Sequence, residues 1–146
     1  MNIIYNIGTR AYFSAIKVAA VFGHRKAKQM EEGRKNWSAL LADKMLPLKG
    51  QKVIWFHAAS LGEFEQGRPL IEALHEKYPE YRVVQTFFSP SGYEVRKNYK
   101  GADVICYLPY DTPSNCRRFL DLVHPDIAIF VKYEFWGHIL QELKRR

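Results

Sequence analysis

Cysteine is scarce in this sequence, and so are the short motifs that mark common cofactor sites. The chain has only two cysteines, Cys106 and Cys116, and neither falls in a C-X-X-C or C-X-X-H spacing. A disulfide framework or a structural zinc site would need such pairs, so we expect a reducing compartment and no structural metal. The sequence also has no G-X-G-X-X-G, Walker-type or G-X-S-X-G loop. These absences argue against nucleotide binding by those loops and against a serine-hydrolase nucleophile.

Acidic residues are scarce in the first quarter of the chain. The formal net charge is +7, and residues 1–36 hold seven basic side chains against two acidic ones, so most of the excess lies there. Such asymmetry favours a polyanionic partner or an anionic membrane surface. The aromatic residues are not interleaved with the basic run in the way that single-stranded nucleic-acid binding requires, so we expect no nucleic-acid partner.

A long uninterrupted apolar run is also missing from the N-terminal region. Apolar side chains dominate there, but four polar ones recur at spacings that place them on one stripe of a helix. They are Asn6, Arg10, Ser14 and Lys17. A membrane-spanning helix would hold Arg10 and Lys17 in hydrocarbon, at about 2.5–3.5 kcal/mol each. We therefore interpret residues 1–36 as a basic amphipathic helical segment on an anionic membrane surface. The alternative is a helix that packs on its own domain or on a partner domain.

The remainder of the chain alternates short apolar runs with helical patterns, after a polar linker around residues 46–51. Strands are predicted at residues 53–57, 82–87, 104–108 and 127–131, and helices at residues 66–78, 91–99, 112–123 and from 135 onward. Strands that alternate with helices indicate a parallel sheet covered by helices on both faces. The fold class is therefore α/β, with the sheet domain over residues 50–146.

Four turns should meet at the carboxyl edge of this sheet, where open α/β folds bind their ligands. Each turn carries polar groups that a site could use. These are Ser60 and Glu63, Ser89 and Ser91, Tyr110 and Asp111, and Lys132 and Glu134.

Glu63 is the most informative of these residues, because a carboxylate in a turn with little bulk around it is a candidate general base. Ser60-X-X-Glu63 also fits a capping box, in which Glu63 would only stabilise a helix start. A helix that began at Ser60 would hold Pro69 in its interior, where proline removes a hydrogen bond and clashes. We therefore predict that the helix begins near Glu65 and leaves Glu63 free in the turn.

Other polar and aromatic residues have simpler interpretations. Ser91-X-X-Glu94 is a second capping-box match, and Glu94 is expected to act as a cap. His57, at the end of a buried strand, is expected to be a hydrogen-bonded structural histidine. Asp111 is expected to stabilise a turn. Phe135 and the neighbouring tryptophan are expected in the core.

The same turns carry a resemblance to a known family. Residues 55–64, Trp-Phe-His-Ala-Ala-Ser-Leu-Gly-Glu-Phe, resemble the signature turn of the 3-deoxy-D-manno-octulosonic acid (Kdo) transferases of lipopolysaccharide synthesis. Residues 86–94 resemble the family's threonine/serine-Pro-X-Gly segment, residues 107–111 its Leu-Pro-X-Asp turn, and residues 133–136 its Glu-X-Trp element. The four motifs occur in the family's order, and the resemblance covers essentially the whole chain but only the N-terminal half of the family's usual length.

The resemblance implies a GT-B glycosyltransferase of two Rossmann-like domains. This chain would supply the N-terminal domain, which binds a lipid A precursor as acceptor, and the C-terminal domain, absent from the sequence, would bind the donor CMP-Kdo. Transfer would be inverting, with no cofactor and no metal. The location implied is the cytoplasmic face of the bacterial inner membrane. Without its donor domain the chain alone is expected to be inactive.

The resemblance also assigns roles to individual residues. Glu63 would be the general base and Glu134 a second, supporting acid. The acceptor side would be lined by Ser60, Gly62, Ser89, Ser91, Gly92 and Lys132. The chain departs from the family at Leu61, where valine is common, and at Lys132-Tyr133 before Glu134. Two alternatives remain open: another GT-B glycosyltransferase with a different sugar or acceptor, and a non-enzymatic α/β binding domain in which Glu63 is only a helix cap.

Overall fold

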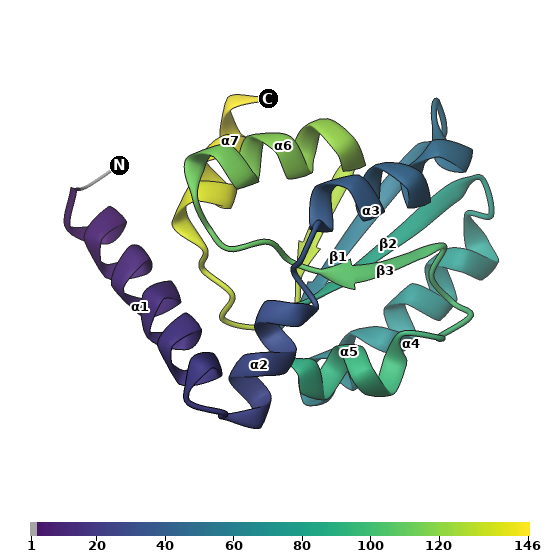
Figure 1. The fold of residues 1–146 in the computed structure, drawn as a ribbon. Coiled ribbons are helices and arrows are strands. Elements are labelled where there is room, and N and C mark those ends of the chain that lie inside the picture. The colour runs from purple at the N-terminus through teal and green to yellow at the C-terminus, as the bar shows by residue number, and fades with distance from the viewer. Residues whose placement is uncertain (1–2) are drawn as a thin grey trace.

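Four parallel strands form the centre of the computed structural model, which describes residues 3–146 (Figure 1). The strands are β1 (Lys52–Ala58), β2 (Tyr81–Phe87), β3 (Val104–Tyr107) and β4 (Ile127–Phe130), in the order β3-β2-β1-β4. They are connected in turn by α4 (Leu61–Lys77), α5 (Pro90–Arg96) and α6 (Pro113–Val123). The predicted α/β class and parallel sheet are confirmed, and the arrangement is Rossmann-like.

Helices cover both faces of the sheet, as the alternation predicted (Figure 1). On one face, Trp55 and its strand neighbours Val84 and Val104 pack beneath α3 (Trp37–Met45), α6 and α7 (Gly137–Arg145). On the other face, Ile54 and Phe56 pack against α4 and α5. Because side chains alternate between faces along a strand, the run of buried residues in β1 serves both cores at once.

The observed boundaries differ from the predicted ones mostly by a few residues. Two elements before the sheet were not predicted, namely α3 and a 3₁₀ turn, η1 (Leu46–Leu48). Helix α3 has only a weak sequence pattern, and it buries little beyond Leu41 and Met45. Its position is set by the apolar face of the sheet that it covers, which is a tertiary feature.

The predicted start of the helix after β1 is wrong. Helix α4 begins at Leu61, its N-cap is Ser60, and it carries Pro69 in its interior. A proline there costs about 3 kcal/mol. The continuous helix buries Phe64 and Ile71 completely against the sheet, and each such side chain contributes about 1.5–3 kcal/mol. Packing on both sides of the proline therefore outweighs its local cost.

The N-terminal segment forms two helices that pack at the carboxyl edge of the sheet. Helix α1 (Ile3–Val21) turns at Gly23, whose φ is +85°, into α2 (Arg25–Glu32). Phe13 of α1 is buried and stacks on Tyr110, with the ring centroids 4.3 Å apart. The alternative interpretation, a helix that packs on its own domain, is thus confirmed for this side of α1.

The opposite side of α1 is apolar and exposed. Ile4, Ile7 and Val18 have exposed fractions of 75%, 63% and 54%, and the cations Arg10 and Lys17 are also exposed. Helix α1 therefore has two apolar faces, of which only one is covered by the domain. No helix within residues 3–146 is long and apolar enough to cross a membrane.

A buried arginine just after α2 joins the N-terminal helices to the sheet. The Arg34 guanidinium donates hydrogen bonds to the backbone oxygens of Leu108 at 2.9 Å, Phe88 at 2.8 Å and Met30 at 3.1 Å. It also lies 4.7 Å from the ring centroid of Tyr110. Burial lowers the pKa of Arg34 to about 10, so the side chain stays charged at neutral pH.

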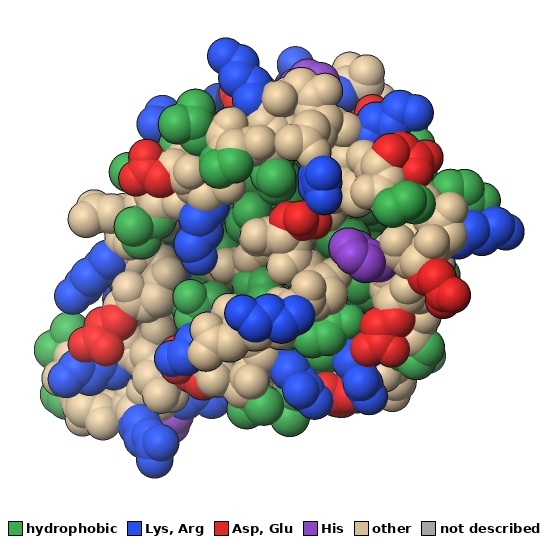
Figure 2. Space-filling view, turned by 90° about the vertical axis from the view of Figure 1, so that its right-hand side faces the viewer, with side chains coloured by type: hydrophobic (Ala, Val, Ile, Leu, Met, Phe, Trp, Pro, Cys, Tyr) green, Lys and Arg blue, Asp and Glu red, His purple; other side chains and the backbone are tan. Residues whose placement is uncertain are grey.

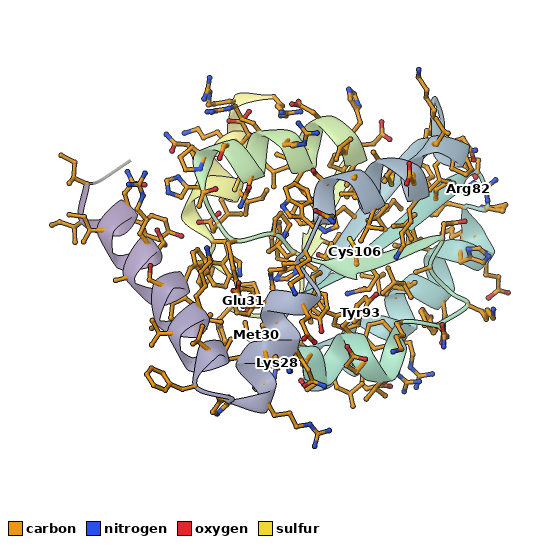
Figure 3. All side chains as sticks on the ribbon, viewed as in Figure 1. Lys28, Met30, Glu31, Arg82, Tyr93 and Cys106 are labelled. Atoms are coloured by element: carbon orange, nitrogen blue, oxygen red, sulfur yellow. The ribbon has the colours of Figure 1, made fainter. Side chains whose placement is uncertain are left out.

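Helix α2 makes further contacts at this junction. Met30 and Glu31, both labelled in Figure 3, belong to it. Met30 shares an apolar cluster with Phe13 and Phe88, and the Glu31 carboxylate accepts a hydrogen bond from the Tyr110 hydroxyl. The turns after β2 and β3 are therefore held from the same side by apolar and polar contacts.

Replacing Arg34 with methionine should lower the free energy of unfolding by about 3 kcal/mol, because three carbonyl oxygens lose a charged donor. Urea denaturation measures this loss. Lys35→Met is the matched control, since Lys35 is exposed and adjacent, and it should change stability by less than about 0.5 kcal/mol. A loss below about 1 kcal/mol for Arg34→Met would contradict the structural role given to this arginine.

Candidate functional site

The turns after β1, β2 and β4 meet at the carboxyl edge of the sheet. The backbone amide of Ser89 donates to the Ala59 oxygen at 2.8 Å, which joins the first two turns. The amide of Val131 donates to the His57 oxygen at 2.9 Å, which joins the turn after β4 to β1. The predicted shared edge is thus confirmed, and it lies next to α1 and α2 in Figure 1.

Glu63 sits in the first turn of α4, three residues after the N-cap. The Ser60 hydroxyl donates a hydrogen bond to the Glu63 carboxylate instead of capping a backbone amide. That hydrogen bond, together with the Glu63 backbone amide and the charge of Lys132, lowers the pKa of Glu63. The carboxylate is therefore ionised at neutral pH, and it is also favoured by the positive end of the helix dipole. The structure thus places the Glu63 carboxylate at a helix start, and its role as a general base stays a prediction.

Gly62 lies in the same turn and is exposed. A Cβ atom built on it would meet no other atom within 4 Å, so the space beside the backbone is open. The absence of a side chain here leaves the start of α4 accessible. Contact with an acceptor through Gly62 stays a prediction.

Ser89, Ser91 and Gly92 lie at the start of α5, in the turn after β2. Ser89 is the N-cap and accepts a hydrogen bond from the Ser91 amide at 3.3 Å, and the two hydroxyl groups lie 3.1 Å apart. Gly92 is buried, and a Cβ atom there would overlap the Phe87 ring. Only the two serines therefore present side chains at this edge.

The predicted capping box at Ser91 is wrong. Helix α5 begins at Pro90, so its N-cap is Ser89, two residues before the Ser91 cap that the motif predicted. Glu94 instead binds Lys97 at 2.9 Å on the exposed side of α5. Proline at the first helical position, with its fixed φ, sets this start.

Glu134 is held by two side-chain donors on one oxygen. Its Oε2 atom accepts hydrogen bonds from His57 Nε2 at 3.1 Å and from Trp136 Nε1 at 2.7 Å. Burial alone would raise the pKa of Glu134, but these hydrogen bonds outweigh it and the pKa is lowered. Lys132 reaches this turn with a φ of +61°, a left-handed conformation. His57 is fully buried and hydrogen-bonded, as expected.

The aromatic residues that flank Glu134 differ from each other. Trp136 is half-buried and packs against Phe88, with ring centroids 4.7 Å apart, as expected of a core residue. The prediction for Phe135 is wrong, because its side chain is 74% exposed. Tyr133 is exposed too, so the turn after β4 alternates outward aromatic residues with the inward Glu134.

Asp111 does more than stabilise its own turn. Its carboxylate accepts hydrogen bonds from the backbone amides of His138 at 3.0 Å and Ile139 at 2.9 Å, at the start of α7. It also accepts one from the Tyr5 hydroxyl of α1. Sequence reasoning missed Tyr5 and Arg34, because neither stands in a recognisable motif. The third turn therefore faces α1 and α7, and its polar groups are already engaged.

The opposite edge of the sheet contains a cavity of about 590 Å³. Apolar residues of α3, η1 and α6, among them Met45 and Leu122, line it together with Lys49 and Asp121. Figure 2 shows this face, on which basic, acidic and hydrophobic side chains are interspersed. None of the sequence-predicted site residues lies there. Within residues 3–146 no group of three or more His, Cys, Asp or Glu side chains could hold a metal ion.

Comparison with known proteins identifies related sequences. A family model described as 3-deoxy-D-manno-octulosonic-acid transferase (kdotransferase) matches residues 20–146. Three similar proteins are each named 3-deoxy-D-manno-octulosonic acid transferase. That of Chlamydia trachomatis is 37% identical over 102 residues, which are 67% of this chain and 23% of the relative. That of Haemophilus influenzae is 36% identical over 91 residues, 62% of this chain and 21% of the relative.

The third relative, from Aquifex aeolicus, is 35% identical over 88 residues, 60% of this chain and 24% of the relative. The matched segments therefore cover only about a fifth to a quarter of the length of these relatives. The region matched by the family model contains all of the candidate site residues.

Replacing Glu134 with glutamine should lower the free energy of unfolding by about 1–2 kcal/mol at pH 7, because two hydrogen bonds lose their ionised acceptor. The folded-state pKa lies below the ordinary value of 4.5, so this stability is present above pH 4.5 and is lost as the pH falls through the folded-state pKa. The difference between variant and wild type should accordingly shrink as the pH is lowered below 4.5 in urea denaturation.

The matched control for this experiment is Glu76→Gln on the exposed face of α4. It should have little effect on the free energy of unfolding at either pH. A stability difference for Glu134→Gln that grows as the pH falls would contradict the hydrogen-bonding assignment.

Proposed function

Because the chain belongs to the Kdo transferase family, we propose that it is the acceptor-binding N-terminal part of an enzyme that transfers Kdo from CMP-Kdo to a lipid A precursor. The observation that carries this proposal is the pair of ionised carboxylates, Glu63 and Glu134, on adjoining turns of one sheet edge. The C-terminal part of such an enzyme, of GT-B architecture, would bind the donor.

Glu63 is the proposed general base. Its carboxylate takes the proton from an acceptor hydroxyl group while the hydroxyl oxygen forms a bond to the anomeric carbon of Kdo. The bond from that carbon to the CMP phosphate oxygen breaks, and CMP leaves with the electron pair. Attack opposite to the leaving group inverts the anomeric configuration. The lowered pKa of Glu63 supports the ionised form that this step requires.

Neighbouring residues fit an anionic, phosphorylated acceptor. The Ser60 hydroxyl keeps Glu63 oriented, and the exposed Lys132 adds a positive charge close to it. Ser89 and Ser91 supply hydroxyl groups on the adjoining turn. In this proposal these side chains bind the acceptor, and no metal or other cofactor takes part in a step.

The proposed location is the cytoplasmic face of the bacterial inner membrane, and the exposed side of α1 supports attachment to a membrane surface. Its apolar face is bordered by Arg10 and Lys17, an arrangement suited to the head-group region of an anionic bilayer. The covered side of the same helix touches Tyr110 and Trp136 beside the candidate site. A membrane-bound acceptor would therefore meet the site next to the helix that lies on the membrane.

Glu63→Gln should reduce Kdo transfer by about 10²–10⁴-fold, because the amide cannot accept the proton. The measurement uses the polypeptide encoded by the complete reading frame, with CMP-Kdo and a lipid A precursor. Glu72→Gln on the exposed side of the same helix is the control and should stay within about twofold of wild type. Near-normal turnover in a folded Glu63→Gln protein would overturn the base assignment.

Replacing Ile4, Ile7 and Val18 with serine should weaken binding to vesicles of anionic phospholipid by at least about tenfold, because each exposed apolar side chain loses its transfer free energy. Co-sedimentation with vesicles measures the affinity. Serine at three exposed apolar positions elsewhere provides the control, namely Leu46, Leu70 and Val95. Equal loss in both triple variants would show that α1 is not the membrane-binding surface.

A further inference from the structure

A line of buried hydrogen bonds runs from the sheet core to Glu134. Thr86 on β2 is fully buried, and its hydroxyl oxygen lies 2.8 Å from Trp55 Nε1 and 2.8 Å from His57 Nδ1. The other ring nitrogen of His57, Nε2, lies 3.1 Å from Glu134 Oε2. Trp55 and His57 are also fully buried, so no water competes for these groups.

The donors and acceptors along this line fix the position of a proton. The indole N–H of Trp55 can only donate, so it occupies one lone pair of the Thr86 oxygen. The single hydroxyl proton of Thr86 then has two possible acceptors, His57 Nδ1 at 2.8 Å or the Phe56 backbone oxygen at 3.4 Å. Donation to Nδ1 gives the Thr86 hydroxyl proton the shorter and better hydrogen bond, and this is the arrangement we assign.

The histidine must then carry its proton on Nε2, directed at Glu134. A neutral imidazole that accepts at Nδ1 has its N–H at Nε2, which donates to the carboxylate oxygen. The opposite tautomer would set the Nε2 lone pair against the Oε2 lone pairs at 3.1 Å, which is repulsive. Of the two neutral tautomers, only the Nε2–H form gives each N–H and O–H group from Trp55 to His57 an acceptor.

This line of hydrogen bonds leaves one carboxylate oxygen of Glu134 without a protein partner. Oε2 receives both donors, His57 Nε2 and Trp136 Nε1, whereas Oε1 makes no hydrogen bond to any residue from 3 to 146. The side chain of Glu134 retains 18% exposure at the carboxyl edge of the sheet. An ionised oxygen that is fixed in direction and open to solvent is a hydrogen-bond acceptor for an incoming hydroxyl group.

We propose that Thr86 and His57 are positioning residues that hold Glu134 so that its Oε1 atom accepts a hydrogen bond from a substrate sugar hydroxyl. Glu134 then orients the substrate and takes no proton, which separates its role from that of Glu63. The catalytic consequence rests on the proposed function, whereas the tautomer and the hydrogen-bonded line do not.

The first test needs no substrate. Nitrogen-15 NMR of the imidazole groups at neutral pH should show His57 as the Nε2–H tautomer, with Nδ1 as acceptor. Assignment uses a His57→Gln sample, in which the signals disappear. An Nδ1–H tautomer in the wild-type protein would contradict the assigned hydrogen bonds from Thr86 through His57 to Glu134, whether or not the protein transfers Kdo.

The second test is a double-mutant cycle in the polypeptide encoded by the complete reading frame. Thr86→Val keeps the shape of the side chain but removes the hydroxyl group, and it should reduce kcat/KM for Kdo transfer about tenfold, with Thr86→Ser within threefold of wild type. Thr86→Val combined with Glu134→Gln should be no slower than Glu134→Gln alone, because both changes remove the same interaction. Losses that multiply would show that Thr86 acts only on general stability and would overturn the proposal.

A second pair of variants guards against misfolding of Thr86→Val. Glutamine at position 57 can place an N–H group where the Nε2–H of histidine lies, whereas the shorter asparagine cannot reach Glu134. His57→Gln should therefore retain at least fivefold more activity than His57→Asn at similar thermal stability. Equal activity of the two variants would contradict a donor role for His57.

Discussion

The buried guanidinium of Arg34 is the interaction on which the arrangement of the carboxyl edge depends. A buried cation is usually paired with a carboxylate, but this one is surrounded by three backbone oxygens and aromatic rings. Its partners lie on α2, after β2 and after β3. One side chain therefore fixes the N-terminal helices against two of the four turns, and the aromatic cluster around Phe13 closes over the same junction.

The two carboxylates of the edge are kept ionised by different means. Glu63 lies at a helix start, where a serine hydroxyl, a backbone amide and the helix dipole favour the charge. Glu134 lies in a half-buried turn, where two ring N–H donors compensate for lost hydration. In the proposed mechanism, Glu63 accepts the proton of the reacting hydroxyl group and Glu134 holds a substrate hydroxyl group in place. One sheet edge thus presents two ionised carboxylates in different environments.

Local sequence patterns predicted some features of the fold and site better than others. The parallel sheet and the shared edge followed from the alternation of apolar runs with helical patterns, and α6 (Pro113–Val123) lies within one residue of its predicted bounds. The start of α4 was mispredicted, because the local penalty of Pro69 was weighed without the burial of Phe64 on the sheet. Phe135 was mispredicted because its apolar character was taken as a sign of burial.

The sequence by itself determined the order of the elements, the place of the candidate site at the strand ends and the family to which the motifs belong, because these depend on periodicity and on residues close together in the chain. Tertiary structure alone decided which polar groups meet. Tyr5 reaches Asp111 and Arg34 reaches Leu108 across separations of 106 and 74 residues. The imidazole of His57 lies between Thr86 and Glu134 for the same reason: parallel strands bring distant segments to neighbouring positions, and no local pattern encodes that pairing.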